Sequence, residues 1–182
     1  MAKPKQQHWL MKSEPDGFSI TDLARVKIEP WTGVRNYMAR NHMRQMRVGD
    51  AVLFHHSSCE PPGVAGLARV VRVGVVDETQ FDPASKYYDA KSTREAPRWD
   101  CVEVEYVETL PVYVDLATMR ADAALADMVL LRRGMRLSVQ PATAAEYARI
   151  VKLGHRATRR AASPKPAGRT SRSGTSRSTA RS

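Results

Sequence analysis

The chain of 182 residues is 42% hydrophobic and 26% charged, and its formal net charge is +10. This length suits one domain with a continuous core, and no stretch approaches the ~20 apolar residues that a membrane helix needs. The polar start of the chain, residues 1–7, is followed by no apolar segment of the kind found in secretory signals. We therefore expect a soluble, cytoplasmic protein, associated with the nucleoid in a bacterium or nuclear in a eukaryote.

Cysteine usage points the same way. Cys59 and Cys101 are the only cysteines, and they stand far apart outside any CxxC pattern. This excludes a disulfide framework and a four-cysteine zinc site, so two free thiols in a reducing compartment are expected.

The basic charge is concentrated at the C-terminal end. Residues 155–182 contain seven Arg, one Lys and no acidic residue, a charge of +8 that leaves only +2 for the rest of the chain. We expect a polar lead over 1–7, a folded domain over 8–154 and a disordered tail over 155–182, because the tail has no residue suited to a core. The tail suits either a solubilising extension or an arm that binds phosphate backbones by counterion release.

Short strands and short helices follow one another along the body of the chain without regular βαβ alternation. Hydrophobic periodicity, capping boxes and the positions of Gly and Pro predict their boundaries. In chain order we expect a strand over 8–12, a helix over 19–26 opened by a Ser19–Asp22 capping box, a helix over 34–46, a strand over 51–56, one or two bent strands over 63–76, a turn-rich segment over 81–97, a half-buried strand over 99–110, short helices over 115–119 and 124–131, a strand over 137–140 stopped by Pro141, and a helix from a Thr143–Glu146 capping box to Leu153.

Five or six such strands predict an α+β fold, a small mixed β-barrel surrounded by short helices. Within it, the segments 63–76 and 99–110 should pair in a mainly antiparallel sheet, with the helix over 143–153 packed outside.

No catalytic or metal site is apparent in the sequence. His55 and His56 would point to opposite faces of a strand over 51–56, so they could not converge on one metal, and no other ligand cluster completes a zinc site. Nothing orients a His base toward Cys59 as a nucleophile, and Pro62–Gly66 lacks the residues of a phosphate-binding loop. We therefore expect a binding protein with no enzymatic activity, no metal and no cofactor.

The strongest signal for binding surrounds Trp31. This residue stands in a loop directly before a helix whose first turn carries Arg35 and Asn36. A helix N-terminus suits an anion, a Trp can stack on a flat ligand, and an Asn amide can hydrogen bond to the edge of a base. The alternatives are that Trp31 caps the core and that the arginines only form a solvated face. Further along the same helix, three arginines at helical spacing are candidates for contacts with a nucleic-acid backbone: Arg40, Arg44 and Arg47.

Several motifs occur in a specific order from residue 8 to residue 153. They are Trp9–Pro15, Trp31–Asn41, Phe54–Ser57, Pro62–Gly66, Gln80–Pro83, Pro97–Trp99 and Leu137–Pro141. In their order and spacing they resemble the EVE-domain family, and a match of this extent is far more specific than one short motif. The resemblance implies a PUA-like fold related to the YTH readers of methylated adenine in RNA. It also implies a pocket for a modified base, with modified cytosine in DNA as the favoured ligand.

Carried over by motif, Lys12 and Ser13 would line one wall, Trp31 would stack on the base, and Trp99 is a second aromatic candidate. His55 stands where the family usually has Tyr, which replaces a phenol with a group that titrates near pH ~6.5. The complete set of expected base-binding residues is Lys12, Ser13, Trp31, Arg35, Asn36, His55, His56, Ser57 and Trp99.

These observations predict a monomeric nucleic-acid-binding module that recognises a modified base of DNA or RNA. The alternative is an RNA-binding or RNA-modification component, or a small-ligand sensor, that uses the same pocket.

Overall fold

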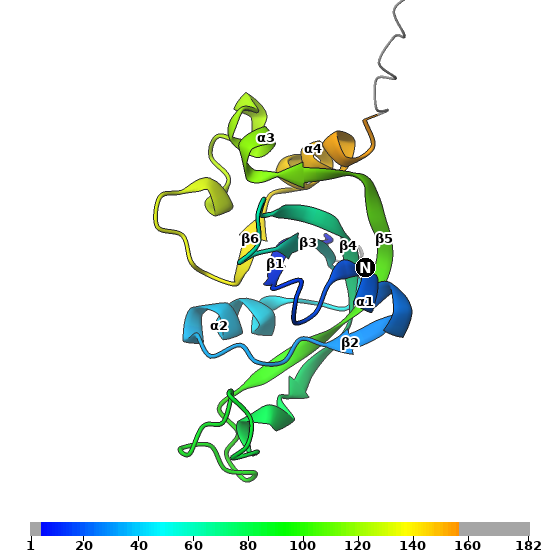
Figure 1. Cartoon of the computed structure of the whole chain (residues 1–182). Coiled ribbons are helices and arrows are strands. Elements are labelled where there is room, and N and C mark those ends of the chain that lie inside the picture. Colours follow the sequence, from blue (N-terminus) through cyan, green and yellow to red (C-terminus); the bar gives the residue numbers. More distant parts are fainter. Residues whose placement is uncertain (1–4, 157–182) are drawn as a thin grey trace, which may run out of the picture.

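One six-stranded sheet with flanking short helices organises the chain in the computed structural model, which describes residues 5–156 (Figure 1). The elements are β1 His8–Ser13, α1 Ile20–Val26, β2 Ile28–Pro30, α2 Tyr37–Gln45, β3 Ala51–His56, β4 Gly63–Val76, the 3-10 helix η1 Glu78–Gln80, β5 Asp100–Asp115, α3 Leu116–Arg120, the 3-10 helices η2 Ala123–Leu125 and η3 Val129–Leu131, β6 Val139–Ala142, and α4 Ala144–Gly154. The basic tail that the sequence predicts to be disordered lies outside the described residues from 157 onward.

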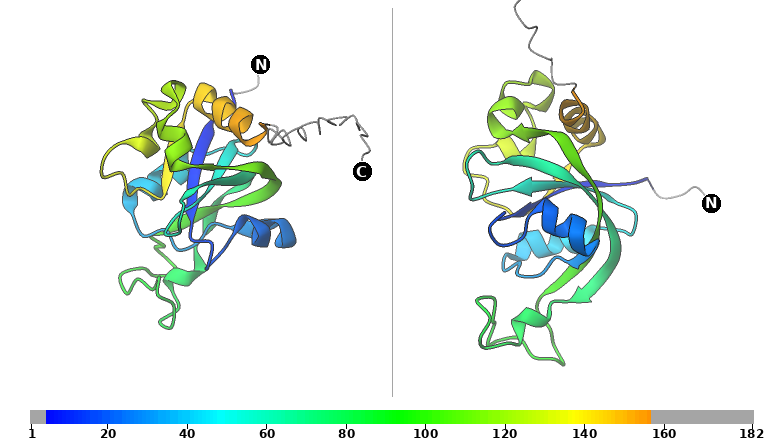
Figure 2. Two further views of the ribbon diagram at one scale, coloured as in Figure 1. Left: turned by 45° about the horizontal axis from the view of Figure 1, so that its top comes forward. Right: turned by 45° about the vertical axis from the view of Figure 1, so that its right-hand side comes forward.

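The strands lie in the order β2-β5-β4-β3-β1-β6. Within the described residues, β1 and β3 pair in parallel and all other strand pairs are antiparallel. The long strands β4 and β5 pair as predicted, and repeated shifts in their register bend the sheet. Figure 2 shows the resulting curvature of the sheet. Within residues 5–156 the edge strands β2 and β6 do not pair with each other, so the barrel is open. The predicted α+β class and small mixed barrel are thus confirmed.

Side chains alternate between two cores on opposite faces of the sheet. Trp9 and Met11 of β1 pack with α1 and α2, whereas Leu10 between them packs toward α3 and α4. This alternation follows from the two-residue period of a strand. Ala39, Met43 and Met46 recur at i, i+4 and i+7 in the helix expected over 34–46, a spacing that predicts a core stripe, and all three are buried. Both predicted capping boxes are also present, at the starts of α1 and α4.

Several boundaries differ from the prediction for local reasons. The helix expected from residue 34 begins at Tyr37, and the helix expected over 124–131 is replaced by η2 and η3. Pro141 does not stop the last strand but pairs opposite Trp9 within β6. An edge strand tolerates a missing N–H, which explains this position. Because Cys101 alternates in sequence with Val102 and shares the parity of Glu103, we expect it on the solvent face of the strand, but it is buried. The short edge strand β2 was not predicted.

In the part of the chain that the structure describes, no helix combines the length and apolar character needed to cross a bilayer.

Candidate functional site

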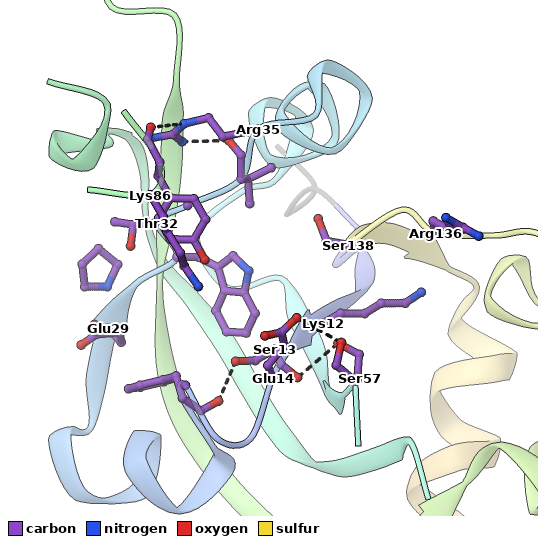
Figure 3. Close-up of a pocket in the computed structure, with 18 of the residues that line it drawn as sticks. Lys12, Ser13, Glu14, Glu29, Thr32, Arg35, Ser57, Lys86, Arg136 and Ser138 are labelled. Atoms are coloured by element: carbon purple, nitrogen blue, oxygen red, sulfur yellow. Dashed lines mark hydrogen bonds between the residues drawn. The ribbon is translucent and has the colours of Figure 1, made fainter. Parts of the chain in front are cut away.

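An open pocket of about 800 Å³ lies where the C-terminal end of β1 meets four other segments of the chain (Figure 3). Its lining comes from residues 12–14, 17–18, 29–35, 57–58, 86–87, 135–136 and 138. Lys86 and Arg35 lie on one side in this view, and Ser138 and Arg136 on the other. The pocket is therefore assembled from distant parts of the sequence, with β1 between its two sides.

Trp31 links this pocket to the core. Its indole is 7% exposed and stands edge-on to the ring of Phe54, with 5.4 Å between ring centroids and an interplanar angle of 81°. Its backbone N–H donates to the carbonyl of Val102 at 2.8 Å. Trp31 is thus held rigidly by core contacts while it lines the pocket, and an aromatic face fixed in this way is suited to stacking.

The carboxylate of Asp77 fixes the loop that follows Trp31. Its Oδ2 accepts hydrogen bonds from the Gly33 N–H and from Nη1 of Arg35, both at 2.8 Å. Burial acts to raise the pKa of Asp77, but the hydrogen bonds from Arg35, Thr79 and Gly33 outweigh it and hold the pKa below its ordinary value. Asp77 therefore remains ionised and anchors the loop.

Arg35 acts mainly as a cross-link in this arrangement. Besides contacting Asp77, it donates from Nε to the carbonyl of Tyr87 at 2.7 Å and from Nη2 to Oγ1 of Thr79 at 2.9 Å. Its guanidinium also lies over the rings of Tyr87 and Trp99, at 5.6 and 5.4 Å from their centroids. These contacts occupy most of its donors and tie the loop after β2 to the segment that carries Tyr87.

Gly33 and Tyr87 determine the shape of this side of the pocket. Gly33 has φ +81°, and a Cβ atom built on it would lie 2.6 Å from Cε2 of Tyr87. The tyrosine ring thus occupies the space that any side chain at position 33 would need. Only glycine meets both the backbone and the packing requirement here.

Lys12 is the cation at the centre of the site. Its Nζ donates to the carbonyl of Met135 at a long 3.4 Å, and burial lowers its pKa below the ordinary value. In Figure 3 it extends from β1 toward the side that carries Ser138 and Arg136. An ammonium group has three donors, so Lys12 can bind an acceptor of a ligand while it keeps this contact.

Five of the nine predicted base-binding residues line the pocket. They are Lys12, Ser13, Trp31, Arg35 and Ser57. The hydroxyl of Ser13 donates to the carbonyl of Phe18 at 2.6 Å, and the N–H of Ser57 donates to the carbonyl of Ser13 at 2.8 Å. These two serines thus hold the end of β1, the turn after it and the end of β3 together.

The two histidines lie outside the pocket lining. His55 is 2% exposed, and neither ring nitrogen has a hydrogen-bond partner within residues 5–156. Burial, with a smaller contribution from Lys12, lowers the pKa of His55 to about 4. Nε2 of His56 accepts a hydrogen bond from the N–H of Ile20 at 3.1 Å, at the start of α1. One ring is thus buried and the other half-buried.

Asn36 and Trp99 also lie outside the pocket lining. Asn36 is the N-cap of α2, and its Oδ1 accepts hydrogen bonds from the N–H groups of Met38 and Ala39 at 2.9 and 3.0 Å. Trp99 stacks on Tyr37 with 4.8 Å between centroids, and its Nε1 donates to Asp89 at 2.8 Å. The Oδ1 atom of Asn36 and the Nε1 atom of Trp99 thus have partners within the fold.

The arginines expected to contact a backbone differ in availability. Arg40 donates to the carbonyl of Arg98 at 2.7 Å and lies over the ring of Tyr37. Arg44 forms an ion pair with Asp100 of β5, which raises the pKa of the guanidinium further. Arg47 is exposed at the end of the helix. Two of the three therefore already have partners.

Sequence reasoning missed several residues of the site, among them Lys86, Tyr87, Arg136 and the anchoring Asp77. The turn-rich segment 81–97 shows no periodicity that would bring Tyr87 to a pocket, and nothing in the sequence pairs Asp77 with Arg35. In the described residues, no group of three or more His, Cys, Asp or Glu side chains is placed to hold a metal ion.

Comparison with known proteins agrees with this fold. The family model described as "EVE domain" matches residues 7–153, and the chain belongs to this family. Among its relatives is thymocyte nuclear protein 1. The zebrafish (Danio rerio) protein is 39% identical over 170 residues, 83% of this chain and 73% of the relative. The human (Homo sapiens) protein is 38% identical over 173 residues, 83% of this chain and 75% of the relative.

Solved structures show that the similarity extends to the three-dimensional fold. A hypothetical protein from Leishmania major matches with a TM-score of 0.80 and 48% identity, covering 82% of this chain and 95% of that one. Human thymocyte nuclear protein 1, solved in complex with 5-methylcytosine-containing DNA, matches with a TM-score of 0.78 and 37% identity. That match covers 84% of this chain and 99% of the human one.

Proposed function

We propose that this chain is a nucleic-acid-binding module that recognises a modified base, with modified cytosine in DNA as the preferred ligand. The observation that carries the proposal is the similarity, over 84% of the chain, to a protein solved with 5-methylcytosine-containing DNA. The pocket around Trp31 offers the matching chemistry, a rigid aromatic face beside a lysine.

The energies are consistent with base extrusion into this pocket. Taking a base out of a duplex costs a few kcal/mol, and stacking on an aromatic side chain returns ~1–3 kcal/mol. Stacking on Trp31 therefore needs support from hydrogen bonds to the edge of the base. Lys12, Ser57 and Ser138 are the polar groups of the lining that we assign to this task.

We further propose that the module binds without catalysing a reaction. The described lining of the pocket includes no His, the most frequent general base, so its serine hydroxyls have no imidazole in the lining to activate them as nucleophiles. His55 and His56 lie outside it.

The proposal is tested by titrating the full chain with duplexes that differ only in one central cytosine, either 5-methylated or unmodified. Matched RNA duplexes and the free nucleoside form further arms. We expect the methylated DNA to bind more tightly than the unmodified DNA. Equal affinity for both would overturn the proposal, and a preference for the RNA or the free nucleoside would favour the alternative ligands.

Substitution of Trp31 tests the stacking role. Trp31→Ala should weaken binding to the methylated duplex by ~1–3 kcal/mol, because the stacking face is lost. It should also lower the unfolding free energy by ~3–5 kcal/mol, since the indole packs on Phe54. Trp31→Phe keeps an aromatic face and part of the packing, so it should bind better than Trp31→Ala. Thermal melts and titrations of both variants separate the two effects. A methylation preference that survives in a folded Trp31→Ala protein would contradict the stacking role.

A further inference from the structure

The segment between η3 and β6 carries three arginines beside the pocket. Arg132, Arg133 and Arg136 are all exposed, and Arg136 lines the pocket together with Met135. Within the described residues, none of the three forms an ion pair or a side-chain hydrogen bond. The segment 129–142 contains no acidic residue that could neutralise them locally.

This lack of partners distinguishes them from the arginines of β4 and α4. Arg69 and Arg72 of β4 pair with Glu105 and Glu103 of β5, and Arg149 of α4 pairs with Asp122. A guanidinium that has no protein carboxylate in reach keeps its planar set of donors available for the oxygens of a phosphate.

The backbone that carries these arginines is fixed in position. The N–H of Met135 donates to the carbonyl of Arg132 at 3.2 Å, and Gly134 between them has φ +76°. Lys12 anchors the segment twice, by its Nζ to the carbonyl of Met135 at 3.4 Å and by its N–H to the carbonyl of Ser138 at 2.8 Å. The turn is therefore joined directly to the strand that forms the centre of the pocket.

We propose that Arg132, Arg133 and Arg136 bind the phosphates that flank the base held in the pocket. This inference rests on the proposed function. A base that enters the pocket stays covalently joined to its neighbours, so its flanking phosphates must lie at the pocket mouth, where Arg136 stands. The sequence predicts contacts with the nucleic-acid backbone from α2, but Arg40 and Arg44 of α2 already have partners within the fold. We therefore assign these contacts to the turn.

The test compares two charge-matched double variants of the full chain. Arg132→Gln with Arg133→Gln removes two cations from the turn. Arg120→Gln with Lys152→Gln removes two exposed cations that do not line the pocket. Affinity for the methylated and unmodified duplexes is measured from low to moderate salt, and thermal melts verify that both variants fold.

We expect the slope of log affinity against log salt to become shallower by about 2 in the turn variant, because each phosphate contact contributes about 0.9. The ratio of affinities for methylated and unmodified DNA should stay at the wild-type value, because phosphate contacts position the duplex without reading its bases. The control variant should change the slope much less. Arg136→Gln alone should reduce the slope by about 1.

The outcomes separate this inference from the proposed function. A turn variant with the wild-type slope, or a control variant with an equal loss of slope, overturns the role of the turn while the wild-type preference for methylated DNA still stands. A wild-type protein with no preference overturns the proposed function, and with it the placement of these arginines beside a bound base.

Discussion

At the scale of single residues, the pocket depends on positions where two requirements coincide. Gly33 combines a positive φ with a Tyr87 ring that leaves no room for a Cβ atom. Trp31 combines a face toward the pocket with packing against Phe54. Asp77 orients the loop that follows Trp31 by accepting hydrogen bonds from Gly33 and Arg35. These groups of the pocket lining are therefore positioned by contacts within the fold.

Gly33→Ala should reduce ligand affinity because it displaces the ring of Tyr87, which lines the pocket. The alanine Cβ would stand 2.6 Å from the ring of Tyr87, so the ring must move. Gly74→Ala is the matched control, because Gly74 also has a positive φ (+65°) but nothing within 4 Å of a built Cβ. Both variants should lose ~1–2 kcal/mol of stability from the left-handed backbone, measured by denaturant unfolding. Only Gly33→Ala should weaken binding to the methylated duplex, and equal binding by the two variants would contradict the role of Tyr87.

At the scale of elements, α2 is shaped by its caps and by its contacts with β5. Asn36 ends the extended segment from the pocket and opens the helix by accepting two backbone hydrogen bonds. Arg44 ties the last turn of the helix to Asp100 on β5. The polar face that resembled a nucleic-acid contact in the sequence is therefore partly used to dock the helix on the sheet.

Asn36→Ala should lower the unfolding free energy by ~1 kcal/mol, the usual cost of losing an N-cap, and should leave base preference unchanged. Asn36→Asp keeps a capping oxygen and should retain most of this stability. Thermal melts and the paired duplex titrations measure the two effects. Lost discrimination at unchanged stability would instead support the sequence-based hypothesis that Asn36 binds the edge of the base.

At the scale of the whole molecule, burial of histidines makes the fold sensitive to acid. Burial lowers the pKa of His8, His42, His55 and His56, and the shift to about 4 at His55 is the largest of these. His155 differs, because its hydrogen bond with Glu108 raises its pKa. The folded state therefore binds fewer protons at these four rings than the unfolded chain does.

Stability should fall as the pH drops from about 6.5 to about 4. A histidine with a depressed pKa is neutral in the folded state. Its contribution to the free energy of unfolding is fully present above the pKa of the unfolded chain, and it is lost at lower pH because protons bind the unfolded chain. For His55, with a folded pKa of about 4, the loss amounts to ~3 kcal/mol. His55→Phe should flatten the decline of unfolding free energy, measured in urea at several pH values. His155→Gln should not flatten it, because a raised pKa adds stability at low pH. An unchanged decline in His55→Phe would contradict the prediction.

Local features of this protein could be derived from the sequence because they depend on residues only a few positions apart. The two capping boxes, the buried stripe of α2 and the two long strands β4 and β5 follow from capping signals and from helical and strand periodicities. The family resemblance, carried by motifs over most of the chain, placed Lys12, Ser13 and Trp31 at the pocket, where the structure has them.

Tertiary structure alone decided which polar groups remain available for a ligand. Nothing in the sequence shows that Asn36, Arg40 and Arg44 have partners. In the fold, Asn36 accepts a hydrogen bond from a backbone amide, Arg40 donates to a distant carbonyl, and Arg44 pairs with a carboxylate of β5. Arg132 and Arg133 carry no sequence signal that separates them from the other arginines, and their lack of partners emerges only from the fold. The reason is physical: a hydrogen bond or ion pair is satisfied by whichever group the folded chain brings within reach, and that group is often far away in the sequence.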